Sequence, residues 1–68
     1  MHTAKISGSS NISQVEWDDS TLFITFTKGT KYKFEGPTLS DYKSLISAAS
    51  VGGYFAANIK PRFKGVPV

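Results

Sequence analysis

The chain has 68 residues, no cysteine and a formal net charge of +3. A chain of this length forms one domain, and without cysteine neither a disulfide nor a thiolate zinc site can supplement its apolar core. No run approaches the roughly 18 apolar residues of a membrane span, and no basic and apolar leader opens the sequence. We therefore expect a cytoplasmic protein.

The basic residues are concentrated in the second part of the chain. Residues 28–68 carry seven Lys or Arg side chains against two carboxylates, whereas residues 1–27 carry one lysine against three carboxylates. A basic face attracts polyanions. A net charge of about 2 to 8 is also ordinary for a small domain that stays in solution. The charge alone therefore does not identify a partner.

The first ordered element is predicted at residues 12–17. Residues 1–9 are small or polar and are predicted to be a mobile lead-in, which leaves residues 10–68 as a single folded domain. Polar residues at 18–21 favour a turn because their side chains bond neighbouring backbone. His2 falls in the lead-in, where we expect an exposed side chain without a catalytic or ligand role.

Two further strands are predicted at 21–27 and 30–34, where apolar residues occupy every second position. Such alternation indicates one face on the core and one in water. A two-residue turn at Lys28 and Gly29 would mix apolar and basic residues on both faces. A three-residue loop that ends in a left-handed Gly29 separates them, and we predict that register. The predicted core face carries Val15, Trp17, Leu22, Ile24, Phe26, Tyr32 and Phe34.

A helix is predicted after the sheet. Thr38 followed three residues later by Asp41 is typical of a helix N-terminus, with the hydroxyl as cap and the carboxylate in the first turn. Gly52 and Gly53 are predicted to break this helix. Its apolar stripe at helical spacing, which should lie on the sheet, consists of Leu39, Tyr42, Leu45, Ile46 and Ala49.

A second, shorter helix is predicted next. Ser50 is expected to cap it, and Phe55 and Ile59, four residues apart, are expected on one side of it. Pro61 disfavours its continuation.

The last residues, 62–68, are predicted to be an extended tail from which Phe63 packs back on the core. An edge strand in this tail is an alternative, with Pro67 limiting its length. The fold class is therefore predicted as α+β, a three-stranded antiparallel β-meander with two C-terminal helices packed on one face.

Residue patterns that support catalysis or metal binding are missing from the sequence. The one histidine lies at position 2, thiols are absent, and no carboxylates show the spacing of a metal site or an acid–base pair. Gly52 and Gly53 lack the lysine and the glycine spacing of a phosphate loop. We expect a non-enzymatic protein without a metal or cofactor.

The outer face of the predicted sheet is the first candidate binding surface. It carries Phe23, Lys31 and Lys33, with Glu16 beside them. An exposed ring can stack a nucleobase while ammonium groups contact phosphates, which suits single-stranded nucleic acid. As an alternative, the lysines protect the sheet from aggregation and another segment covers Phe23. Glu16 opposes anion binding at this surface.

The second candidate is the basic cluster Lys60, Arg62 and Lys64, which alternates along the predicted tail. Alternate residues of an extended chain project to one side, so phosphate contact is one interpretation. A solvated tail, with Lys60 compensating a helix dipole, is the other. Tyr54 also has two interpretations: its ring is exposed at the start of the helix, or it is half-buried with a hydrogen-bonded hydroxyl.

Several short motifs occur in a fixed order. They are Tyr32 with Phe34, a Gly-Pro pair at 36–37, a Ser-Val-Gly-Gly-Tyr-Phe run at 50–55, and Ile59 before a lysine. In this order they resemble the KTSC domain. That family is a small module found at the C-terminus of some lysyl-tRNA synthetases and as a free-standing protein of bacteria and their phages.

The resemblance covers about residues 10–64, beginning with Ser10 before the first strand. This sequence departs from the family motif at Phe34, where the family has tyrosine, and at Ala56, where it has asparagine. The valine of the family's Gly-Val-Pro is also missing.

The resemblance implies a binding role, with RNA suggested by the attachment to a synthetase. Our interpretation of the residues themselves makes the motif positions structural, with Tyr32, Phe55 and Ile59 in the core, Ser50 as a cap and Gly52 as a helix break. The motif positions carried over are Tyr32, Ser50, Gly52, Tyr54, Phe55 and Ile59.

Two functional hypotheses follow. The first is a small non-enzymatic module that binds nucleic acid, expected to be RNA, weakly through the basic sheet face and the C-terminal tail. The second is a protein-interaction module of phage or bacterial origin, which docks a host or phage protein through Phe23 and the sheet edge or forms a homodimer there. The residues assigned to nucleic-acid binding are Phe23, Lys31, Lys33, Lys60, Arg62 and Lys64.

Overall fold

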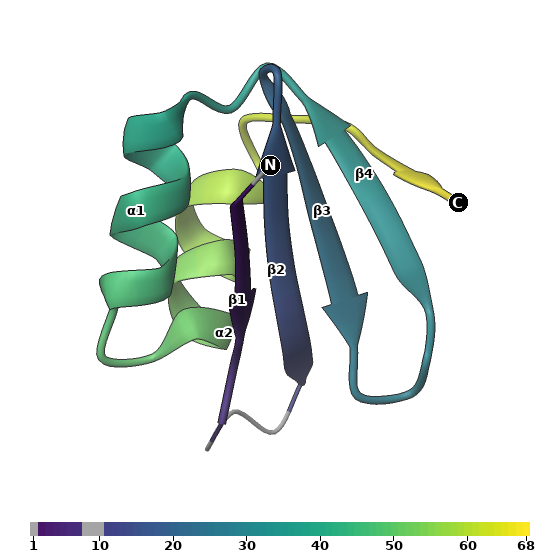
Figure 1. Cartoon of the computed structure of the whole chain (residues 1–68), viewed down its shortest axis with the longest axis vertical. Helices are drawn as coiled ribbons and strands as arrows, with labels where there is room; N and C mark the ends of the chain where they lie inside the picture. The colour runs from purple at the N-terminus through teal and green to yellow at the C-terminus, as the bar shows by residue number, and fades with distance from the viewer. Residues whose placement is uncertain (1, 8–10) are drawn as a thin grey trace.

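An antiparallel sheet with both helices on one side is the architecture of the chain (Figure 1). The structure is a computed structural model that describes residues 2–7 and 11–68, so that Ser10 and part of the predicted lead-in lie outside the described residues. The strands follow one another in the order β1-β2-β3-β4-β5. In chain order the elements are β1 (His2–Lys5), β2 (Ile12–Asp18), β3 (Thr21–Phe26), β4 (Lys31–Glu35), α1 (Leu39–Ser47), α2 (Val51–Tyr54), the π-helix η1 (Phe55–Ile59) and β5 (Gly65–Pro67).

The β3–β4 hairpin has the predicted register. Ile24 lies opposite Tyr32, and Phe26 N donates a 2.8 Å hydrogen bond to Thr30 O. Gly29 has φ +97° in the three-residue loop, a conformation that glycine adopts without steric cost. The predicted core face is confirmed, because this register places the aromatic residues of β4 toward the helices and its lysines on the opposite face.

The prediction of three strands is wrong, because the sheet has five. The additional strands β1 and β5 lack an apolar alternation: their core-facing positions hold His2 and Ala4 in β1, and Gly65 and Pro67 in β5. Gly65 is required there by space, since a Cβ would lie 2.6 Å from Cε2 of Phe34. The alternative of an edge strand in the tail is confirmed.

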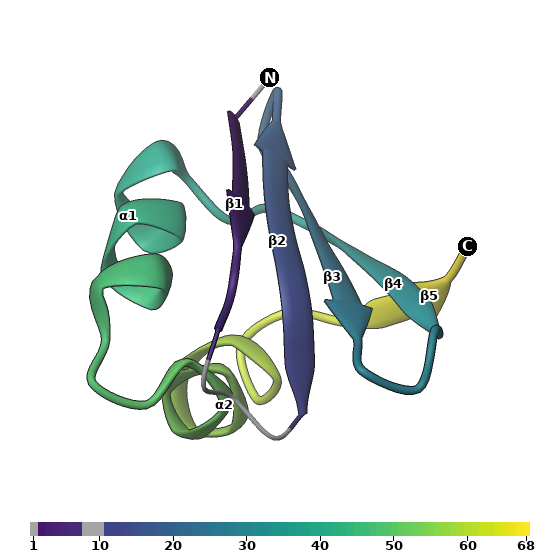
Figure 2. The same cartoon turned by 60° about the horizontal axis from the view of Figure 1, so that its bottom comes forward.

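The core lies between the sheet and the helices (Figure 2). Trp17 closes one side of it, where Nε1 donates a 2.8 Å hydrogen bond to Pro37 O and so holds the segment between β4 and α1 against the sheet. Phe63 packs against the core, as predicted. The buried apolar side chains are Ile12, Val15, Leu22, Ile24, Phe34, Tyr42, Leu45, Phe55 and Ile59.

Helix α1 begins as predicted. Thr38 Oγ1 accepts a hydrogen bond from Asp41 N (3.2 Å), and Asp41 Oδ2 accepts one from Thr38 N (2.9 Å). This reciprocal pair is a capping box. Tyr42 and Leu45 of the predicted stripe are buried, while Leu39 and Ile46 are partly buried. None of the helices in the described part of the chain has the length and apolar character to cross a membrane.

Gly52 and Gly53 do not break α1, contrary to the prediction. The helix ends before Ala48, whose backbone is extended, and Ala49 therefore lies outside it. The two glycines belong to α2, where Ser50 Oγ accepts a 3.1 Å hydrogen bond from Gly53 N. The cap satisfies a first-turn amide that has no acceptor within the helix, which offsets the poor helix propensity of glycine.

The first testable prediction concerns β5. Gly65→Ala should lower the free energy of unfolding by about 1–3 kcal/mol, because the new methyl group collides with the buried Phe34 ring. Urea denaturation of the variant measures this loss. Val66→Ala in the same strand, at a side chain 42% exposed, is the control and should change stability by about 0.5 kcal/mol or less. Equal stability of all three proteins would contradict the placement of β5 against Phe34.

Candidate functional site

The outer sheet face brings Phe23, Lys31 and Lys33 together, as the sequence predicts. Phe23 pairs with Glu16 on one side and with Lys33 on the other. Lys31 Nζ lies 5.3 Å from the centroid of the Phe23 ring and 3.0 Å from Glu16 Oε1. Lys33 Nζ lies 4.0 Å from Glu35 Oε2. Lys31 and Lys33 therefore each already have a carboxylate partner.

The Phe23 ring is half-buried, with an ammonium group over its face. The carboxylate of Glu16 is sheltered, since its side chain is 15% exposed. An anion that approached Lys31 would have to compete with this carboxylate, and a base that stacked on Phe23 would have to displace the lysine. The outer face is thus a mixed-charge surface.

The tail cations Lys60, Arg62 and Lys64 do not alternate along one extended strand. After η1 the chain keeps turning, because the amides of Arg62 and Phe63 both donate to Ile59 O, at 3.1 and 3.0 Å. The predicted extended conformation is therefore wrong for the first residues of the tail. All three cations are exposed, and Arg62 Nη1 lies 3.7 Å from Asp41 Oδ1.

A groove that the sequence analysis missed lies on the helix side of the sheet. It has a volume of about 620 Å³ and is formed by the end of the β3–β4 hairpin, η1 and the start of β5. We call it the hairpin groove. Five aromatic rings and two ammonium groups are among the side chains that line it, from Phe26, Tyr32, Phe34, Phe55, Phe63, Lys28 and Lys60.

The rings of the hairpin groove pack edge to face. Phe26 lies 5.8 Å from Tyr32 and 5.7 Å from Phe55 between ring centroids, at interplanar angles of 81° and 73°. Phe26 and Tyr32 remain half-buried because they occupy the core-face positions nearest the hairpin loop. Two aromatic residues at this end of a hairpin are the sequence signal that could have identified the groove.

The family motif divides between the core and this groove. Tyr32, Gly52 and Phe55 line the groove, whereas Ile59 is fully buried. Tyr54 is half-buried and its backbone oxygen accepts a hydrogen bond from the Asn58 side chain. Phe34 and Ala56, the two positions at which this sequence departs from the motif, also line the groove.

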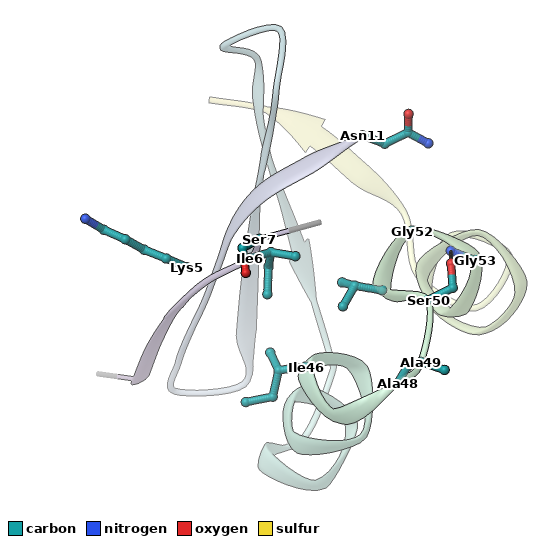
Figure 3. Close-up of a pocket in the computed structure, with 11 residues that line it drawn as sticks. Lys5, Ile6, Ser7, Asn11, Ile46, Ala48, Ala49, Ser50, Gly52 and Gly53 are labelled. Atoms are coloured by element: carbon teal, nitrogen blue, oxygen red, sulfur yellow. Dashed lines mark hydrogen bonds between the residues drawn. The ribbon is translucent and has the colours of Figure 1, made fainter. Parts of the chain in front are cut away.

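A second hollow, of about 430 Å³, lies between the end of β1 and the segment that joins α1 to α2 (Figure 3). Figure 3 shows the side chains of Lys5 and Asn11 extending away from it. The hydroxyl of Ser50 is occupied by the amide of Gly53. Lys5 is therefore the one charged residue among the described residues that line this hollow, and its side chain points away from it.

The remaining titratable groups give no cluster. Among residues 2–7 and 11–68, no three His, Cys, Asp or Glu side chains come together. His2 is exposed, as expected, and its ring lies 5.7 Å from the centroids of both Trp17 and Tyr42. Burial raises the pKa of the Tyr42 hydroxyl.

A second prediction tests whether Ser50 acts as a cap. Ser50→Ala should reduce stability by about 1 kcal/mol because Gly53 N loses its acceptor, whereas Ser50→Asp should retain stability because aspartate caps equally well. Thermal unfolding monitored by circular dichroism compares the three proteins. An alanine variant as stable as the parent would contradict the capping role.

Comparisons with known proteins identify the family and the fold. The family model described as the KTSC domain matches residues 8–63. The chain is also similar to a crystal structure of a KTSC domain protein from Yersinia pestis, with a TM-score of 0.88 and 28% identity. That similarity covers 98% of this chain and 96% of the other. No curated protein matches the chain.

Proposed function

The chain belongs to the KTSC domain family, and we propose that this member is a non-enzymatic module that binds single-stranded nucleic acid, with RNA as the expected form. The observation that carries the proposal is the pattern of charge pairing on its surface. Phosphate contacts supply most of the affinity in sequence-independent binding of this kind.

The carboxylates of the protein leave most of its lysines unpaired. Among the residues that the structure describes, Lys31, Lys33 and Arg62 are the cations within 4.0 Å of a carboxylate. The acids Asp18 and Asp19 lie in the β2–β3 turn, at the opposite end of β3 from the Lys28 loop. The exposed lysines without a carboxylate partner are Lys5, Lys28, Lys43, Lys60 and Lys64.

Three of these lysines carry the argument: Lys28 and Lys60 line the hairpin groove on the helix side, and Lys64 precedes β5 in the C-terminal segment, so these regions are favoured over Lys31 and Lys33 for phosphate contact. The other two lie elsewhere, Lys5 in β1 on the outer sheet face and Lys43 in α1. Lys60 and Lys64 were assigned this role from the sequence, and their exposure supports it. Lys31 and Lys33 are partly neutralised, so they contribute less to binding than the sequence alone implied. Arg62 is held toward Asp41.

A salt titration of RNA binding is the third prediction. Binding of a single-stranded oligoribonucleotide should weaken steeply with salt, and Lys60→Gln with Lys64→Gln should reduce the slope of log K against log [salt] by ~1.4 if each contacts one phosphate. Fluorescence anisotropy measures both quantities. Lys5→Gln with Lys43→Gln, the same charge change at two exposed lysines elsewhere, is the control.

Two outcomes contradict the proposal or part of it. Absence of RNA binding at low salt removes the function altogether. The salt dependence of binding could instead be unchanged in the Lys60 and Lys64 double variant and reduced in a Lys31→Gln, Lys33→Gln variant. That result would show that the phosphates contact the outer sheet face.

A protein contact on the outer sheet face is the second candidate function. Val66 is 42% exposed and lies opposite Lys33 on this face. Lys33 in turn lies opposite Phe23, so Val66 and Phe23 belong to the same cross-strand row. The face carries charges of both signs and is not covered by either helix. A mixed-charge surface with apolar side chains suits a protein partner better than a polyanion.

The fourth prediction tests this contact with a second copy of the chain or with a host or phage protein. Val66→Glu should abolish any self-association seen by sedimentation equilibrium, or any capture of a defined partner, because it places a carboxylate at an exposed apolar position of this face. Val66→Glu should reduce RNA binding no more than a glutamate introduced at another exposed position does. A monomeric parent protein that captures no partner would contradict the second function.

A further inference from the structure

We infer that the hairpin groove receives a nucleobase of the bound strand, while Lys28 and Lys60 contact the phosphates on either side of it. This inference rests on the proposed function and assigns it a binding site. None of the residues selected for nucleic-acid binding from the sequence, apart from Lys60, lines this groove.

The chemistry of the groove wall fits a planar ring. Its aromatic side chains meet edge to face, at interplanar angles of 73° to 81°, so their faces are not stacked on one another. Phe26 and Tyr32 are half-buried and border the opening. Base–aromatic stacking is the main apolar contribution to single-strand binding and tolerates any base.

The size of the groove is also suitable. At about 620 Å³ it lies within the ~300–1,000 Å³ range of small-ligand sites. It is larger than a packing defect, since protein interiors contain few voids larger than a water molecule. One base with part of its ribose is therefore a reasonable occupant.

The charge of the lining selects an anionic ligand. Two lysines line the groove, and no Asp or Glu is among its described lining residues. Neither lysine has a carboxylate within 4.0 Å in the described part of the chain. A nucleotide combines the planar ring and the anion in one unit, and this combination favours it over a neutral or basic peptide.

The π-helix places a lysine at this wall. Lys60 N donates a 2.9 Å hydrogen bond to Phe55 O, which closes a turn one residue wider than an α-helical turn. This wide turn brings Lys60 closer to the side of Phe55 than an α-helix would, and both residues line the groove. Ile59 remains in the core with no exposed surface. π-helical turns are rare in proteins, and those that do occur are frequently found at functional sites.

Adjacent alanines in η1 provide a matched test. Ala56 and Ala57 are both exposed, but Ala56 lines the groove and Ala57 does not. Ala56→Glu should weaken binding of a single-stranded uridine-rich decaribonucleotide about tenfold. The larger side chain fills part of the groove, and its negative charge repels the phosphates of the RNA. Ala57→Glu makes the same change in net charge and should weaken binding about twofold or less. Circular dichroism of both variants checks that they fold.

A direct readout accompanies the affinities. A strand that contains 4-thiouridine should crosslink on irradiation to the peptide that carries Phe26 or the one that carries Tyr32. Crosslinking should be lost in Ala56→Glu and retained in Ala57→Glu.

The outcomes separate this inference from the proposed function. If the parent protein and both variants bind the RNA equally, the groove is not the binding site and the proposed function stands. If the parent protein does not bind RNA at all, both fail. If an acidic peptide containing phenylalanine binds the parent and is lost in Ala56→Glu, while RNA neither binds the groove nor competes, the groove takes a peptide and the inference is overturned.

Discussion

The register of the β3–β4 hairpin is the constraint on which the rest of this domain depends. Side chains of a strand alternate between faces, so a slip of one residue would place Tyr32 in water and Lys31 under the helices. The left-handed Gly29 fixes the loop at three residues and prevents that slip. With this register, one face of β3 and β4 supplies the aromatic part of the core and the other face carries lysines. The fold and the charge distribution therefore have a common origin in a single loop.

The helices complete the core but do not cover the whole sheet. The short α2 and η1 segment reaches Phe34 and buries it through Phe55, whose ring centroid lies 5.4 Å away. Phe26 and Tyr32, nearer the hairpin loop, stay half-buried and form the wall of the hairpin groove. The aromatic residues of the hairpin are thus buried where η1 covers them and partly exposed near the loop. In this chain the motif residue Phe55 is therefore used for folding, while the motif residue Tyr32 keeps part of its ring exposed.

How much the sequence predicts depends on whether a segment carries a side-chain signal. The hairpin register and the capping box of Thr38 and Asp41 were predictable because alternation and a short polar spacing encode them. Strand β1 was not, because His2 and Ala4 on its inner positions give no apolar period. Strand β5 was predicted only as an alternative, because Gly65 and Pro67 on its inner positions give no such period either. The groove was only partly predictable: the aromatic pair Phe26 and Tyr32 at the end of the hairpin signals it, but the rest of its wall comes from segments distant in the sequence.

Nuclear magnetic resonance of the isotope-labelled protein during titration with a single-stranded oligoribonucleotide tests the central claim most directly. The account predicts that amide shifts concentrate in the loop after Phe26, at Ala56 and around Lys60, the segments that border the groove. Shifts confined to Phe23, Thr25 and Lys33 on the outer face would contradict it.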